Sequence, residues 1–276
     1  MLILRAVLYG ILEGVTEWLP VSSTGHLILL EQVLYLPMSP TATALFEVVI
    51  QLGAMLAVLV CFWQKLVPFG GQRSPRERRF VYGLWGRVLL AALPSAAIGL
   101  WLDDWLTAYC YRPPVVAVTL ILYGLLFIWL EKCRKSHPST DLLPCEDKSL
   151  PLRTAFLIGC FQVLALVPGT SRSGATVLGG MLLGLSRPAA AEFSFFLGLP
   201  TMLGAGLLKG VKLLGEGNWL TAQELLLLFV GTLTAFLTSL AVIRFLMNFV
   251  RRRSFVGFGV YRILLGAAVV ATILCG

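Results

Sequence analysis

Charged residues are scarce in this chain of 276 residues, at 13%, whereas hydrophobic residues make up 58% of it. Soluble domains contain about 25% charged residues. The mean hydropathy is +0.85, and several apolar runs approach the length of about 20 residues that an α-helix needs to cross a bilayer. The shortage of charge excludes an ordinary soluble domain, and we expect an all-α polytopic membrane protein.

The chain also lacks cysteines at the spacings that bind metals or form disulfide frameworks. Its six cysteines are scattered and none forms a CxxC motif, so no zinc site is predicted. We expect buried, unreactive thiols. We also expect no cleaved signal peptide, because the short apolar run Val7–Leu12 is interrupted by Glu13 and leads to no small-residue cleavage site.

The net charge of +8 comes mainly from three basic groups that separate apolar runs, at 65–79, 132–153 and 251–253. Basic loops of this kind are cytoplasmic under the positive-inside rule. They also suit anionic lipid headgroups. We therefore expect membrane lipids as partners and no binding of nucleic acid.

Six apolar runs predict transmembrane helices. They are Leu45–Trp63, Val81–Trp101, Val115–Leu130, Ala190–Leu208, Leu225–Met247 and Phe255–Leu274. With the basic loops inside and a loop at Asp103–Asp104 outside, the region 153–188 must enter and leave on one side, as a re-entrant helical hairpin. The region 1–40 is either a second re-entrant hairpin or a single crossing, and loop charge leaves both open.

An internal repeat favours two re-entrant hairpins. The segment GILEGVTEWLPVSSTGH (10–26) aligns with GCFQVLALVPGTSRSGA (159–175) at an offset of 149 residues, and FEVVIQLG (46–53) resembles AEFSFFLG (191–198). Each unit is a hairpin followed by three spans, and because three is odd the second unit is inverted. We predict one membrane domain, 1–276, with repeat 1 at about 1–131, repeat 2 at about 153–276 and a cytoplasmic connecting loop at 132–152.

The first hairpin is polar where a lipid-facing span would be apolar. Such backbone is tolerated at membrane depth only where it is buried in protein or lines a wet cavity. Glu13 and Glu17 share one helix face and offer the oxygen ligands that Mg²⁺ or Ca²⁺ prefers; a charged face at the headgroups is the simpler alternative. Pro20 is expected to end this helix. Hydroxyl residues 22–24 follow, and then His26, which can act as base, acid or nucleophile near neutral pH.

The second hairpin contains PGTSRSGAT (168–176). Pro168 and Gly169 break a helix, and Ser173 or Gly174 is expected to begin the next one, which would expose backbone N–H groups to an anion. Arg172 adds a forked donor that suits phosphate. Its alternative role is a salt bridge to Glu13, Glu17 or Glu192. Together, the two hairpins provide the groups that phosphoryl transfer requires.

The segments EGVTEWLPVSSTGH (13–26) and PGTSRSGAT resemble the two signature segments of the bacitracin-resistance (BacA) family of bacterial undecaprenyl-diphosphate phosphatases. FEVVIQLGAMLAV (46–58) extends the resemblance. The family pattern is [E/Q]xxxE, a nearby histidine and PGxSRSxxT. The resemblance implies an integral enzyme that hydrolyses undecaprenyl diphosphate to the monophosphate and phosphate with a divalent cation. This reaction recycles the lipid carrier of cell-wall synthesis and confers bacitracin resistance.

The resemblance also implies roles for residues. Glu13 and Glu17 would hold the metal or position water, and Arg172 would bind the diphosphate. Ser23 or His26 would supply the nucleophile or the proton transfer, with attack by water as a third alternative. The catalytic set is then Glu17, Ser23, His26 and Arg172, and the substrate-binding set is Ser22, Thr24, Gln51, Gly169, Thr170, Ser171, Ser173, Gly174 and Thr176.

The resemblance places the chain in the bacterial plasma membrane, and the expected topology opens its site to the outer face; a homodimer is compatible with this prediction. An ion-coupled transporter or polyprenyl-phosphate flippase fits the same scaffold. In that alternative Glu47, Gln51 and Glu192 would couple or control transport. PGTSRSGAT together with His26 favours the enzyme, because a transporter needs neither.

Overall fold

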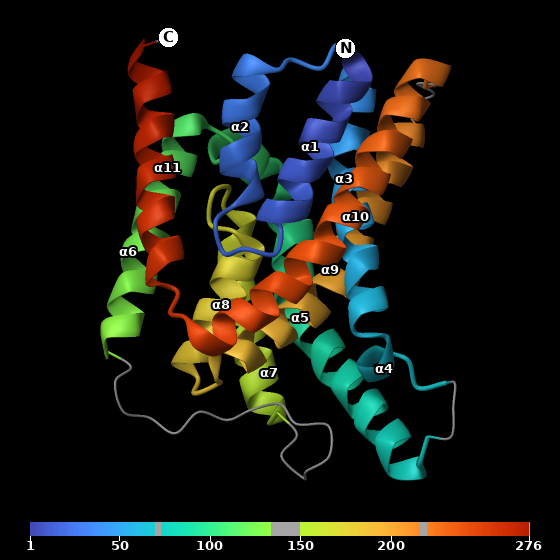
Figure 1. Ribbon diagram of the computed structural model, residues 1–276, viewed down its shortest axis with the longest axis vertical. Helices are drawn as coiled ribbons and strands as arrows, with labels where there is room; N and C mark the ends of the chain where they lie inside the picture. The colour runs from blue at the N-terminus through green and yellow to red at the C-terminus, as the bar shows by residue number, and fades with distance from the viewer. Residues whose placement is uncertain (70–72, 134–149, 216–219, 276) are drawn as a thin grey trace.

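The computed structural model describes residues 1–69, 73–133, 150–215 and 220–275, and its elements in these ranges are helices (Figure 1). Most of the predicted connecting loop 132–152 lies outside the described residues. In chain order the helices are α1 (Leu2–Thr16), α2 (Ser23–Val33), α3 (Pro40–Cys61), α4 (Trp63–Leu66), α5 (Pro75–Tyr109), α6 (Pro113–Cys133), α7 (Leu152–Val163), η1 (Leu164–Leu166), α8 (Arg172–Leu182), α9 (Arg187–Gly215), α10 (Ala222–Arg252) and α11 (Val256–Cys275).

Six helices in the described part of the chain are long and apolar enough to cross a membrane, which confirms the six predicted spans: α3, α5, α6, α9, α10 and α11. Large apolar side chains remain exposed along them, including Trp101, Val118, Phe229 and Leu264. Extensive apolar exposure is unusual for a soluble monomer. It is expected of a surface that faces lipid.

Helix α5 is longer than its apolar run predicted. It begins at Pro75, where Ser74 and Glu77 form a capping box, so the arginines at 76, 78 and 79 lie in its first turns rather than in a loop. It continues to Tyr109, past the loop that was predicted at 103–104. The difference arises because the cap and the first-turn proline fix where a helix starts, whereas hydropathy marks only the part that lipid surrounds.

Two pairs of short helices occupy the predicted hairpin regions. α1 begins at the end of the molecule where the C-terminus also lies, its connection to α2 lies near the middle, and α2 leads back toward the first end (Figure 1). α7 begins at the opposite end and reaches the middle through η1, and α8 leads back from there (Figure 1). The two connections therefore meet in the interior.

Each short pair packs against a helix from the other half of the chain. α1 lies along α10 and α7 lies along α5. At Gly10 a Cβ atom would lie 2.5 Å from the carbonyl oxygen of Gly231, and Gly159 is in similarly close contact with the backbone of Ala91. Small residues allow this approach at helix crossings in membranes, where association depends on close packing.

The largest apolar core surrounds the connection that follows α1. It includes Phe193, Phe195 and Phe196 of α9, which are almost completely buried. Trp18 packs edge-on against Phe195 with ring centroids 5.1 Å apart. Burying a large side chain stabilises a fold by about 1.5–3 kcal/mol, so Trp18 anchors the polar turn around it in the core.

The expectation of buried thiols was wrong in part. The described cysteines at 61, 110, 133 and 160 are free, but Cys133 and Cys160 are exposed on α6 and α7. Their exposure depends on where α6 ends and how α7 packs, which composition does not reveal.

Glu224 connects the starts of two long helices. Its carboxylate accepts hydrogen bonds from the N–H and hydroxyl of Ser39, at 2.9 and 2.7 Å, and from the N–H and hydroxyl of Thr221, at 2.8 and 2.9 Å. Ser39 caps α3 and Thr221 caps α10. One carboxylate thus completes a capping box on α10 and holds the cap of α3.

We expect Glu224→Ala to lower the stability of the folded protein by about 2 kcal/mol, because charged hydrogen bonds at two caps are lost. Thermal unfolding of purified protein in detergent measures the change. Glu77→Ala is the matched control, since Glu77 forms the same capping box on one exposed helix start. Equal shifts of the two melting temperatures would contradict the proposed connection.

Candidate active site

The site contains two turns: the first, residues 17–22, connects α1 to α2, and the second, residues 167–171, connects η1 to α8. The first turn follows α1, which ends at Thr16 rather than at the predicted Pro20. The Glu17 N–H still bonds to the Glu13 carbonyl, at 3.0 Å, so both glutamates lie at the last helical turn. Pro20 has no N–H to offer the Thr16 carbonyl. Beyond Thr16 the hydroxyl of Ser173 contacts the carbonyl oxygens of Glu17 and Leu19, at 3.1 and 3.3 Å. The helix therefore unwinds early because the second hairpin supplies a donor.

The two turns share an unusual backbone conformation. Ser22 and Ser171 are the only non-glycine residues in the described ranges with positive φ, at 74° and 71°. The Ser22 hydroxyl accepts from the Gly25 N–H at 3.5 Å, and the Ser171 hydroxyl accepts from the Gly174 N–H at 3.1 Å. Strained serines that cap helices in this way persist only where the surroundings hold them.

The cap at Ser171 corrects the predicted start of α8, which begins at Arg172 and not at Ser173 or Gly174. Gly169, with φ of 86°, turns the chain immediately before it. A Cβ atom there would lie 2.8 Å from the backbone of Val116, so only glycine fits. The hydroxyl of Thr119 on α6 donates to the Pro168 carbonyl at 2.8 Å and holds this turn from outside.

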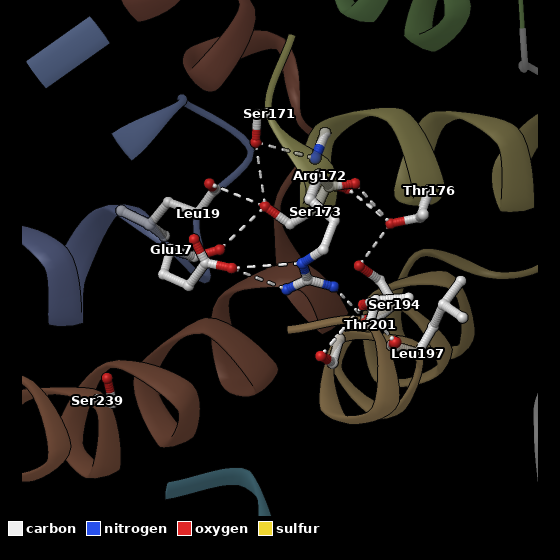
Figure 2. Close-up of polar contacts among 12 residues, drawn as sticks. Glu17, Leu19, Ser171, Arg172, Ser173, Thr176, Ser194, Leu197, Thr201 and Ser239 are labelled. Atoms are coloured by element: carbon white, nitrogen blue, oxygen red, sulfur yellow. Dashed lines mark hydrogen bonds and ion pairs between the residues drawn. The ribbon is translucent and has the colours of Figure 1, made fainter. Parts of the chain in front are cut away.

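A buried ion pair joins the two turns (Figure 2). Arg172 Nη2 lies 3.1 Å from Glu17 Oε1, and the two side chains are 7% and 6% exposed. Arg172 Nε contacts the same oxygen at 3.3 Å, and Nη1 donates to the Ser194 carbonyl on α9 at 2.7 Å. The sequence left three acidic partners open, and the structure selects Glu17. Glu192 instead pairs with Lys65 at 2.8 Å.

The hydroxyls of the second hairpin support Arg172 from its own helix. Thr176 donates to the Arg172 carbonyl at 2.8 Å and bonds to the Ser194 hydroxyl at 2.6 Å, which ties α8 to α9 (Figure 2). Ser173 holds the first turn, and its hydroxyl is also 3.2 Å from that of Ser171. These hydroxyls hold the backbone of α8 around Arg172, whereas the guanidinium itself bonds to Glu17 and to the Ser194 carbonyl.

Glu13 is completely buried, and neither carboxylate oxygen has a hydrogen-bond partner among the described residues. A buried carboxylate without a partner is costly. The described residues contain no cluster of three or more His, Cys, Asp or Glu side chains that could hold a metal. Glu13 and Glu17, one helical turn apart, are the carboxylate pair of the site, and Glu47 is a further carboxylate that interacts electrostatically with Glu13. Such a pair fits a divalent cation of the Mg²⁺ kind, which is commonly held by one or two carboxylates, water and substrate phosphate.

His26 is oriented by two hydrogen bonds. Nδ1 bonds to the Ser22 carbonyl at 2.7 Å, and Nε2 bonds to the Tyr261 hydroxyl at 2.7 Å. A carbonyl oxygen only accepts, so in the neutral ring Nδ1 carries the proton and Nε2 keeps its lone pair. The hydroxyl of Ser23, on the same first turn of α2, interacts with the Glu17 carboxylate.

The remaining predicted residues differ in how they relate to this contact network. Thr24 is half-buried on the first turn of α2, and Gln51 is half-buried on α3. No hydrogen bond found within the described ranges connects Gln51 to either turn. Thr170 is buried in the second turn, where its carbonyl oxygen accepts a hydrogen bond from Arg262.

Two adjacent residues of α11 at the site were missed by the sequence analysis. Tyr261 contacts His26, and Arg262 is buried completely and bonds to carbonyl oxygens of both turns. They lie in an apolar span with no motif around them. The one signal in the sequence was Arg262 itself, because a charged residue within a transmembrane run is costly and its presence therefore points to a function.

The fold and the site together define a polytopic membrane protein with a buried polar centre, built where two helix breaks from opposite ends meet. The centre combines a carboxylate pair, the guanidinium of Arg172, the oriented imidazole of His26 and the N-termini of two helices. Helix starts attract anions. The arrangement suits a phosphorylated ligand.

The chain belongs to the BacA family: the family model of the bacitracin resistance protein BacA matches residues 6–268. It is 51% identical over 269 residues to the undecaprenyl-diphosphatase of Streptococcus thermophilus, covering 97% of this chain and 92% of the relative. It is also 51% identical over 265 residues to the undecaprenyl-diphosphatase of Streptococcus mutans, covering 96% and 93%. The protein is thus a multi-pass membrane protein of a bacterial family, and the resemblance inferred from the motifs is confirmed.

Proposed function

We propose that this protein is an undecaprenyl-diphosphatase, which hydrolyses undecaprenyl diphosphate to undecaprenyl phosphate and phosphate. Its identity of about half to enzymes of that name, over nearly the whole chain, supports this activity. The observation that carries the proposal at the level of the site is the buried contact between Arg172 and Glu17. A guanidinium, which is suited to phosphate, lies against the Glu17 carboxylate in the interior of an apolar scaffold, and this contact supports the proposal.

The scaffold suits a substrate with a long apolar tail. A polyprenyl chain can remain in the bilayer or between spans while its diphosphate reaches the polar centre. A soluble phosphatase would have to extract that tail from lipid, at about 0.8 kcal/mol for each CH₂ group. The membrane location is therefore part of the specificity, and recycling of the lipid carrier for cell-wall synthesis follows from the reaction.

The residues of the two turns have distinct tasks in this function. Arg172 binds diphosphate oxygens through a forked donor, so its bond to Glu17 is shared with the substrate or replaced by it. The backbone N–H groups at the start of α8 add further donors. Ser23, beside Glu17, and His26, through Nε2, are the groups that supply the nucleophile or transfer protons to and from the oxygens of the reacting phosphate, and water is the third candidate for the attack on phosphorus. Glu13 and Glu17 would hold a divalent cation, Mg²⁺ or Ca²⁺, which when bound neutralises charge on the diphosphate.

Glu17→Gln and Arg172→Lys each should lower phosphate release from undecaprenyl diphosphate by at least about 100-fold. The first removes a negative charge at the reacting group, and the second replaces a guanidinium, which can bind phosphate through two donors, by an ammonium. Purified protein in detergent is assayed, where no transmembrane gradient exists. Both variants must still be recovered folded. Near-normal release by either variant would contradict the site, and no release by the wild type would favour the transporter or flippase.

Chelation should abolish phosphate release, and added Mg²⁺ or Ca²⁺ should restore it. We expect Glu13→Gln to raise the cation concentration needed for half-maximal activity by about tenfold or more, because one of two carboxylate ligands is lost. Cation-dependent thermal stabilisation of wild type, absent in Glu13→Gln, gives a second readout without turnover. Full activity in chelator would exclude the cation.

The two hairpins are re-entrant in this proposal and belong to inverted repeats. The equivalent capping serines Ser22 and Ser171 support the repeat, as does the packing of α1 on α10 and of α7 on α5. The helix α4 and the end of α10 lie toward the end of the molecule opposite the chain termini (Figure 1), and both carry basic residues in their last turns. Under the positive-inside rule the termini are outside. The first turn is then reached from the outer face; a homodimer stays a prediction.

A Ser23→Cys variant tests this orientation in a background where the native cysteines are serine. A membrane-impermeant maleimide should label Cys at position 23 in intact cells. The control variant keeps only the native Cys133, which is exposed at the end of α6, and it should be labelled only after permeabilisation. The opposite pattern would reverse the topology.

A further inference from the structure

We propose that Arg262 of α11 is a positioning residue that holds the two turns of the site in register. The proposal rests on the proposed phosphatase function and extends it to a residue outside both motifs. Arg262 is completely buried. Its Nη1 donates to the Pro20 carbonyl at 3.1 Å, and its Nη2 donates to the carbonyls of Gly169 and Thr170, both at 2.9 Å.

The guanidinium binds equivalent positions of the two turns. Pro20 precedes Ser22 by two residues, and Gly169 precedes Ser171 by two residues. Both serines have positive φ, and both cap the helix that follows. One side chain therefore holds the same carbonyl of each strained turn, and strained backbone persists only where its surroundings determine it.

An arginine is suited to this task because of its donor geometry. The guanidinium has five N–H donors in a rigid plane and can serve several carbonyl oxygens at once. Within the described ranges Arg262 forms no ion pair with a carboxylate. The ring of Tyr123, with its centroid 5.5 Å from Arg262 Cζ, and the carbonyl dipoles surround its charge instead. A charged side chain buried without an acidic partner is costly, so we infer that its bonds to the turns maintain it.

The bonds of Arg262 set the positions of the catalytic groups. The first turn carries Glu17 three residues before Pro20, and the second turn leads directly into Arg172. Arg262 Nη1 also lies 3.1 Å from the position of a Cβ atom on Gly174, so it lies against the first turn of α8. A shift of either turn would change how Arg172 meets Glu17 and the substrate.

We expect Arg262→Lys to lower kcat by about 100-fold and to change KM by less than about threefold. An ammonium keeps the charge but cannot hold both turns, and a displacement of reacting groups by about 1 Å costs on the order of 100-fold in rate. Arg262→Ala should lose more activity, and millimolar guanidinium should restore part of its kcat by refilling the site. Phosphate release from undecaprenyl diphosphate in detergent gives these values.

Arg87 provides the matched control. It lies on α5 and donates to the backbone carbonyls of Gly83 and Leu150, so Arg87→Lys also exchanges a guanidinium bonded to backbone oxygens for an ammonium. We expect Arg87→Lys to keep kcat within about twofold of wild type, whatever its melting temperature. Guanidinium should not raise its activity.

The outcomes separate this inference from the proposed function. An inactive wild type contradicts the phosphatase function itself. If the wild type is active, unchanged kcat in Arg262→Lys overturns the positioning role. The role is also overturned if Arg262→Ala shows no rescue by guanidinium and loses kcat only in proportion to its unfolded fraction. A fall of kcat in folded Arg262→Lys, with rescue of Arg262→Ala and an active Arg87→Lys, supports it.

Discussion

The ion pair between Glu17 and Arg172 is the contact on which the two polar turns depend. Taking either charge alone into an apolar interior is costly, and removing one partner of a buried pair typically costs about 3–5 kcal/mol. Here each partner belongs to a different hairpin. The two pairs of short helices are therefore bound to each other by a buried pair of opposite charges, so this polar centre is assembled without a ligand.

Four hydroxyls of the two motifs serve this assembly. Ser173 holds the unwound end of α1, Thr176 ties α8 to α9, and Ser22 and Ser171 cap the following helices. Glu13 differs from them, because its buried carboxylate has no hydrogen-bond partner in the described residues. The contrast separates the groups that build the site from one that is left for a ligand, a proton or a cation.

The packing explains why neither half of the chain could form the site alone. α1 lies against α10, α7 lies against α5, and α11 contributes Tyr261 and Arg262 to turns that come from distant parts of the sequence. Backbone groups freed by helix breaks need partners at membrane depth, where water cannot supply them. Here the partners come from the second half for the first turn, and from α6 and α11 for the second.

The sequence by itself determined the helical class, the six apolar spans and the two polar segments, because hydropathy and helix breakers act locally. Its motifs also identified the family and predicted Glu17, His26 and Arg172 as candidate catalytic residues. The tertiary structure decided that Glu17, and not Glu13 or Glu192, pairs with Arg172. It also decided that α1 ends at Thr16 and that Arg262 holds both turns. Such choices depend on which donors and acceptors meet across more than a hundred residues of chain, and no local pattern records those distances.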